Sequence, residues 1–192
     1  PSVRGAIKPE LMAYGGNSAI AVRGQHWKAT GQGLGILSCN HSFIGNTLLS
    51  ETCGTSFSAP YITHLAGRLL NNYPDASANL LRALLVNQAE MLNEISSTFP
   101  EELAKAYKTK NRRDATHDVA GYGKINESEL FRSSESVVVM LAEEQIAENT
   151  SQFFELPLPD DFLQRRGGLR EIRVSLAYTP PVRTTRIEYR AT

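Results

Sequence analysis

The chain has 192 residues, enough for one or two domains with hydrophobic cores, and its 41% apolar and 21% charged content is ordinary for a globular protein. Lysine plus arginine equals aspartate plus glutamate at 20 each, so no overall field would draw the chain to nucleic acid or to an anionic membrane. No run of about 18 apolar residues is present, which disfavours a transmembrane helix. We therefore expect neither nucleic acid nor a membrane as a partner.

Few residues suit a metal site or a disulfide framework. The two cysteines, Cys39 and Cys53, allow one disulfide between them but do not require it, and there is no CxxC pair to bind zinc. No Asp-rich loop suggests calcium. The histidines show no ligand spacing; they are His26, His41, His64 and His117. We expect no metal and no other cofactor.

The sequence changes character near residue 134. Before it, helical periodicity alternates with glycine-rich connections, and after it period-2 patterns take over. We therefore predict two units, residues 1–133 and residues 134–192.

The first unit begins with loops and a strand. The TGQGLG segment, residues 30–35, has no lysine or helix start placed to hold a phosphate and is interpreted as a loop. Ile36 and Leu37 after it predict a short strand.

Two helices follow in the sequence. From Pro60 onward, apolar residues recur at i, i+3, i+4, i+7 and i+8, which predicts a helix with one buried face; they are Ile62, Leu65, Ala66, Leu69 and Leu70. Asp75 or Ser77 then caps a second helix. Residues 100–108 predict a short surface helix, and GYG at 121–123 predicts a tight turn before another helical turn or two.

The second unit has the pattern of strands. Residues 137–141, 152–158, 171–176 and 186–189 are β-branched or alternate polar with apolar residues. Pro180 and Pro181 separate the last two segments, which favours a small antiparallel module.

The stretch GTSFSAP, residues 54–60, raises the question of chemistry. A serine hydroxyl is a nucleophile only when a base and oxyanion donors are in place, and a helix N-terminus offers unpaired N–H groups and a favourable dipole. Gly54 permits a sharp turn close to a bound peptide, and Thr55 and Ser56 suit a helix start. On these residues alone, Ser56 is either a nucleophile or a part of a helix cap.

Three motifs in order resemble the subtilases, the subtilisin-like serine peptidases. GTSFSAP is similar to their nucleophile motif, KPELMAYG at residues 8–15 to the strand and turn before it, and GYGKI at residues 121–125 to the closing turn. The resemblance covers residues 7–130. Three positions depart from the pattern, namely Tyr14 in place of proline, Phe57 in place of methionine and Tyr61 in place of histidine, and these changes affect substrate preference more than reaction type.

The resemblance implies a Ser-His-Asp endopeptidase in which Ser56 attacks the peptide carbonyl and its backbone N–H is an oxyanion donor, with Gly54 and Thr55 in support. It also implies an α/β fold, namely part of a three-layer, mostly parallel sheet with Ser56 at the start of the central helix, followed by the antiparallel module. No aspartate precedes Ser56, where the acidic residues are Glu10 and Glu51. The triad Asp, the triad His and the oxyanion Asn are therefore expected upstream of Pro1, and this fragment alone is expected to be inactive.

The expected partners are a peptide or protein substrate and the missing N-terminal half, and the exposed apolar surface of the fragment is expected to allow homo-oligomers. The alternative function is a non-catalytic interaction module derived from a degenerate subtilase. The tail is similar to those of certain bacterial subtilases without export signals, which favours a cytoplasmic location, with secretion as the alternative.

Overall fold

The computed structural model describes residues 7–20, 27–28, 33–92, 105, 112–131, 137–164, 167 and 170–179. The strands in this part of the chain are β1 (Ala19–Ile20), β2 (Trp27–Lys28), β3 (Ile36–Cys39), β4 (Leu49–Thr52), β5 (Ala89–Glu90) and β6 (Lys124–Ile125). The helices are α1 (Thr55–Asn72), α2 (Ala78–Asn87), α5 (Arg112–Ala120), α6 (Glu127–Leu130) and α7 (Asp160–Gln164).

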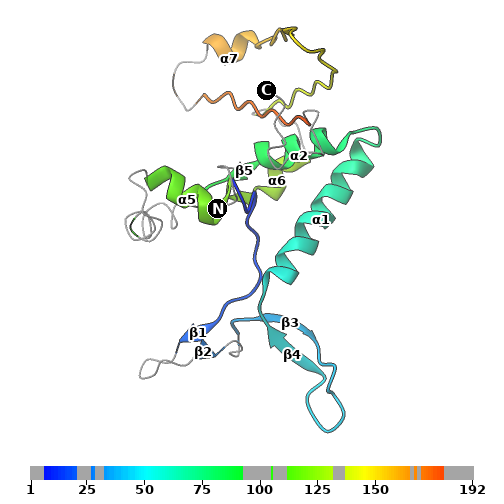
Figure 1. The fold of residues 1–192 in the computed structure, drawn as a ribbon, viewed down its shortest axis with the longest axis vertical. Coiled ribbons are helices and arrows are strands. Elements are labelled where there is room, and N and C mark those ends of the chain that lie inside the picture. Colours follow the sequence, from blue (N-terminus) through cyan, green and yellow to red (C-terminus); the bar gives the residue numbers. More distant parts are fainter. Residues whose placement is uncertain are drawn as a thin grey trace.

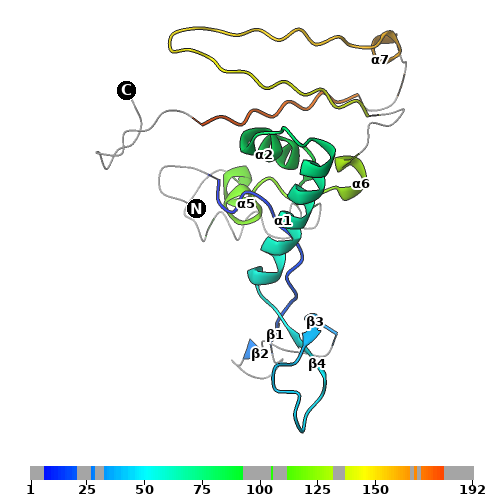
Figure 2. The same cartoon turned by 90° about the vertical axis from the view of Figure 1, so that its right-hand side faces the viewer.

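The long helix α1 connects two parts of the structure (Figure 1). The hairpins β1–β2 and β3–β4 lie at its N-terminal end, and α2, α5, α6 and the β5–β6 pair gather round its C-terminal half. Residues 137–164 and 170–179 form an extended layer beyond α2, which both views show (Figures 1 and 2). β4 leads directly into α1, so the GTSFSAP stretch lies between the hairpins and the helical part.

The core confirms the predicted helical periodicity except at Leu70, which is 42% exposed. Leu65 and Leu69 of α1 are completely buried, and they cluster with four buried residues from α2, β6 and α6; these are Leu84, Leu85, Ile125 and Leu130. The helix begins at Thr55, where the GTSFSAP stretch predicts a helix start, and Pro60 lies inside it. Because Pro60 has no N–H, the carbonyl of Ser56 receives no i→i+4 hydrogen bond.

The N-cap of helix α2 is Ser77 and not Asp75. The Ser77 side chain accepts a hydrogen bond from the backbone N–H of Leu80 at 3.2 Å, as an N-cap does. The predicted helix at residues 100–108 lies outside the described residues, apart from Lys105.

The predicted tight turn at GYG is present and contacts the segment around Glu10 and Met12. Gly121 and Gly123 have φ angles of 62° and 110°. The backbone N–H of Tyr122 donates to Glu10 O at 2.8 Å, and that of Met12 donates to Gly123 O at 2.9 Å. Met12 and Lys124 thereby form an isolated parallel bridge.

The described residues do not form the mostly parallel sheet that the resemblance predicts. They form a mixed α/β structure whose three sheets are each two-stranded and antiparallel, pairing β1 with β2, β3 with β4 and β5 with β6. A parallel strand needs a partner from another βα unit. The isolated Met12–Lys124 bridge is a parallel contact between two described segments, but it does not make a parallel sheet.

Apart from helix α7, the described tail residues are mostly extended, and Val137 forms an isolated β-bridge. No strand is assigned among them, so the segments predicted at 137–141, 152–158 and 171–176 are not formed as strands. Pro157 and Pro159 remove two ladder donors. Segment 170–179 instead lies along α2: Asn87 Nδ2 donates to Arg173 O at 3.2 Å, and Thr179 Oγ1 donates to Asn79 Oδ1 at 2.9 Å. The predicted strand at 186–189 lies outside the described residues.

Large apolar side chains are exposed at the outer parts of the structure. Ile44 at the tip of the β3–β4 hairpin is 89% exposed and Phe153 of the tail is 91% exposed. Cys39 and Cys53 do not form a disulfide, and Cys53 Sγ lies 3.1 Å from Ser18 Oγ. Among the helices described, none is long and apolar enough to cross a membrane.

Candidate active site

Ser56 lies at the position that the nucleophile hypothesis requires. It is the second residue of α1, just after the turn at Cys53 and Gly54 that follows β4. Ser56 and Thr55 are both exposed, and Gly54 is half-buried. The Ser56 hydroxyl also has no hydrogen-bond partner among the described residues.

The backbone around Ser56 is held by the segment that contains KPELMAYG. The Gly54 N–H donates to Gly15 O at 2.7 Å, and Ser58 Oγ donates to Ala13 O at 3.0 Å. The approach is so close that a Cβ at Gly15 would lie 2.6 Å from Ser58 Oγ and 2.7 Å from Gly54 O. Glycine at position 15 is therefore required for this contact.

Replacing Ser58 with alanine is expected to lower the free energy of unfolding by about 1 kcal/mol, because the part-buried Ala13 carbonyl loses its side-chain donor. Urea denaturation of the chain measures this change. Thr63→Ala is the matched control, since the Thr63 hydroxyl only bonds Ala59 O within the same helix. The control is expected to stay within about 0.5 kcal/mol of the wild type. Equal losses in both variants would contradict the role given to Ser58.

The start of α1 favours negative charge beside Ser56. The first N–H groups of a helix lack intrahelical acceptors, and the helix dipole adds a partial positive charge there. No acidic residue lies in the first turn, and Gly54 as N-cap has no side chain to occupy the N–H groups. The geometry suits an oxyanion formed next to Ser56 Oγ.

The three positions that depart from the family pattern lie around one cavity beside Ser56. This cavity has a volume of about 430 Å³ and includes Phe57, the neighbour of Ser56. Its lining residues are Tyr14, Ile36, Phe57, Tyr61 and Lys124. The departures are thus gathered in space, although they are up to 47 positions apart in the sequence, from Tyr14 to Tyr61.

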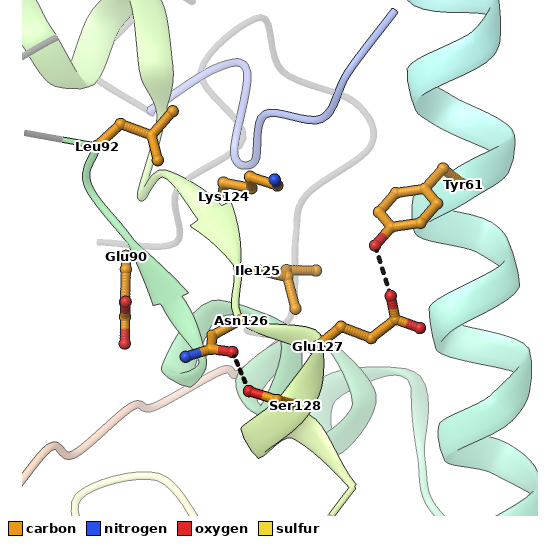
Figure 3. A pocket seen from close by; sticks show the side chains of 8 residues that line it. All are labelled: Tyr61, Glu90, Leu92, Lys124, Ile125, Asn126, Glu127 and Ser128. Carbon is orange, nitrogen blue, oxygen red and sulfur yellow. Dashed lines mark hydrogen bonds between the residues drawn. The ribbon is translucent and has the colours of Figure 1, made fainter. Parts of the chain in front are cut away.

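A second cavity, of about 400 Å³, lies between α1 and the β5–β6 pair and does not include Ser56 (Figure 3). Tyr61 OH donates to Glu127 Oε2 at 2.9 Å across it. Burial raises the pKa of the Tyr61 phenol, and the hydrogen bond with Glu127 raises this pKa further. Tyr61 therefore keeps its proton near neutral pH. Arg68 also pairs with Glu127 and lies 4.1 Å from the Phe131 ring centroid, which fastens α6 to α1.

No described histidine is placed to act as a base for Ser56. His64 is exposed, eight residues further along α1 or about 12 Å along the helix axis. His117 lies in α5, where its Nδ1 is 2.8 Å from Gly121 O and its ring packs edge-on against Tyr122. His41 lies exposed in the β3–β4 connection, and His26 is outside the described residues. The described part of the chain also contains no cluster of three or more metal-ligating side chains.

Comparison with known proteins bears on this geometry. The Subtilase family model matches residues 1–123, which contain the Ser56 turn, the KPELMAYG segment and the GYG turn. The chain belongs to the subtilase family. This membership gives the chain a peptidase lineage.

One curated relative of this subtilase chain is "Uncharacterized protein y4bN" of Sinorhizobium fredii, 34% identical over 194 residues. The alignment covers 98% of the present chain and 42% of the relative, so the chain spans less than half of the relative's length. No solved structure matches the chain.

One residue near the subtilase nucleophile motif was not singled out from the sequence as functional. The Glu51 carboxylate accepts hydrogen bonds from the backbone N–H groups of Gly33 and Gly35. In the sequence Glu51 is only an acidic residue before Ser56. The useful signal is the register of the β3–β4 hairpin, which pairs Ile36 with Thr52 and so brings the glycine-rich segment to Glu51.

Proposed function

We propose that this chain is the nucleophile-bearing part of a subtilisin-like serine endopeptidase. Ser56 attacks the peptide carbonyl, and the backbone N–H of Ser56 is one donor to the oxyanion. The observation that carries the proposal is the exposed Ser56 hydroxyl at the N-terminus of α1, on a turn held by Gly15 and Ala13. Membership of the subtilase family supports this role.

The triad Asp, the triad His and the oxyanion Asn come from another part of the complete protein in this proposal. The described histidines do not contact Ser56, and the relative with 42% coverage is long enough to contain further segments of this kind. The same additional segments complete the mostly parallel sheet, in which the strand-like residues around Met12 already contact Lys124 in parallel. The chain alone is therefore inactive.

A non-catalytic interaction module is the second candidate. It is favoured by the exposed apolar residues of the tail, where Val174 and Leu176 are both 83% exposed while Arg173 and Ser175 contact Asn87 of α2. In this case Ser56 has no base in the complete protein.

A fluorophosphonate probe separates the two candidates, because it reacts only with an activated serine. The complete protein is expected to be labelled at Ser56, as located by peptide mass spectrometry, and the 192-residue chain alone is expected to remain unlabelled. Absence of labelling in a folded complete protein would favour the interaction module. Labelling of a serine other than Ser56 would refute the proposed nucleophile.

A further inference from the structure

Residues 33–35, at the end of the glycine-rich segment, and Glu51 form a second feature close to Ser56 in the chain. Glu51 Oε2 accepts hydrogen bonds from Gly33 N at 2.8 Å and from Gly35 N at 3.2 Å, and Oε1 also accepts from Gly33 N at 3.0 Å. We name this arrangement the carboxylate clamp, formed by Glu51, Gly33 and Gly35. Glu51 lies in β4, five residues before Ser56.

The carboxylate clamp is connected to the nucleophile turn through Leu34. The Leu34 carbonyl accepts hydrogen bonds from the Tyr14 hydroxyl at 3.1 Å and from the Asn17 backbone N–H at 2.8 Å. Residues 14–17 also contain Gly15, whose carbonyl accepts from Gly54 N. Hydrogen bonds therefore link Glu51 to residues 33–35, residues 33–35 to residues 14–17, and residues 14–17 to Gly54.

The packing in this series leaves little freedom. A Cβ at Gly35 would lie 2.8 Å from Thr52 N and 2.9 Å from Glu51 Cβ, and a Cβ at Gly16 would lie 2.9 Å from Cys53 Cβ. Real Cβ atoms do not approach other atoms so closely, so these glycines allow three backbone segments to lie in contact. A rigid support of this kind is what a positioned catalytic group needs.

We propose that Glu51 is a positioning residue for Ser56, whose carboxylate binds the Gly33–Gly35 backbone and thereby holds the turn at Gly54. The proposal rests on the proposed peptidase function. Glu51 does not touch the reacting atoms; it acts through residues 33–35 and 14–17. A carboxylate is suited to this task because charge-assisted hydrogen bonds to backbone N–H groups are stronger than neutral ones.

The charge of Glu51 gives the carboxylate clamp a defined pH dependence. The hydrogen bond from Gly33 and then that from Gly35 lower the pKa of the Glu51 carboxyl below its usual value. Glu51 forms no ion pair within the described part of the chain, and its hydrogen-bond partners there are the backbone amides of Gly33 and Gly35. Because the folded pKa is lowered, the stabilisation is complete above the ordinary carboxyl pKa and is lost as the pH falls through the folded pKa.

Backbone NMR of the 192-residue chain tests the carboxylate clamp without any need for activity. As the pH falls, the amide protons of Gly33 and Gly35 are expected to shift upfield together, with one midpoint below that of an exposed glutamate. Glu51→Gln is expected to abolish this titration and to shift the amide resonances of Gly54, Thr55 and Ser56. Glu155→Gln, at an exposed tail position, is the matched control. It is expected to change neither the titration of the Gly33 and Gly35 amides nor the amide resonances of residues 54–56.

The complete protein supplies the kinetic readout. Glu51→Gln is expected to lower kcat by about ten- to a hundredfold with little change in KM, since the nucleophile is misplaced while the substrate-binding surface remains. An inactive wild-type protein would count against the peptidase function. The NMR titration would still show whether the Glu51 carboxylate binds the amides of Gly33 and Gly35. The positioning role is refuted if the Gly33 and Gly35 amides do not titrate together, or if Glu51→Gln leaves the Ser56 amide unmoved. The wild-type titration involves no substitution, so a folding defect in the variant does not affect it.

Discussion

Replacing Ser56 with alanine in the complete protein is expected to lower kcat by about 10⁶-fold while the protein remains folded. Loss of the nucleophile alone has an effect of this size in subtilisin, because the base and the oxyanion donors cannot act without it. The Ser56 side chain is exposed and has no hydrogen-bond partner among the described residues, so its removal leaves the local packing intact. Hydrolysis of a fluorogenic peptide measures the loss.

The control for this experiment is Ser42→Ala, which removes an exposed hydroxyl from the β3–β4 connection. It is expected to keep the full kcat, and both variants are expected to unfold at the urea concentration of the wild type. Retention of more than about one hundredth of the activity by Ser56→Ala would assign catalysis to another group, since loss of a catalytic serine lowers kcat by about 10⁶.

Replacing Gly123 with alanine is expected to have the largest effect on stability, a loss of about 3–5 kcal/mol in the free energy of unfolding. Gly123 has a φ of 110°, which a residue with a Cβ rarely adopts, and its Cβ would lie 2.1 Å from Glu90 O. The substitution also disturbs the carbonyl that accepts from Met12 N. Chemical denaturation followed by far-UV circular dichroism measures this change.

Gly67→Ala is the matched control, because it adds the same methyl group to the middle of α1. Outside the adjoining backbone of α1, no atom lies within 4 Å of a Cβ at Gly67, and alanine favours a helix more than glycine does. The free energy of unfolding is expected to increase by about 0.5–1 kcal/mol. If Gly67→Ala lowered the free energy of unfolding as much as Gly123→Ala does, the loss at Gly123 could not be attributed to the clash of its Cβ and to its positive φ.

Features that depend on neighbouring residues were predicted correctly from the sequence. The spacing of Leu65 and Leu69 predicts a helix with a buried face, and both are completely buried in α1. Ile36 and Leu37 lie in β3, and the GYG turn has the positive φ angles that its glycines permit. Hydrophobic periodicity and turn chemistry act over a few residues, so a single sequence contains them.

Features that depend on distant partners were predicted less well. The prediction of a mostly parallel sheet was wrong for the described residues. A period-2 or apolar segment does not indicate which strand it pairs with, or whether that strand is present in the chain. The same reason applies to the tail, whose alternating segment 171–176 lies along α2 without a strand partner. The division into units at residues 133 and 134 stays a prediction.

The sequence by itself determined that a serine stands at the start of an amphipathic helix, within three ordered motifs of one peptidase family. Only the tertiary structure decided what surrounds that serine. It brought Tyr14, Phe57 and Tyr61 to one cavity and placed the Glu51 carboxylate on the backbone of Gly33 and Gly35. Such contacts join residues 16 to 47 positions apart, and hydrogen bonds and packing between them exist only after the chain has folded back on itself.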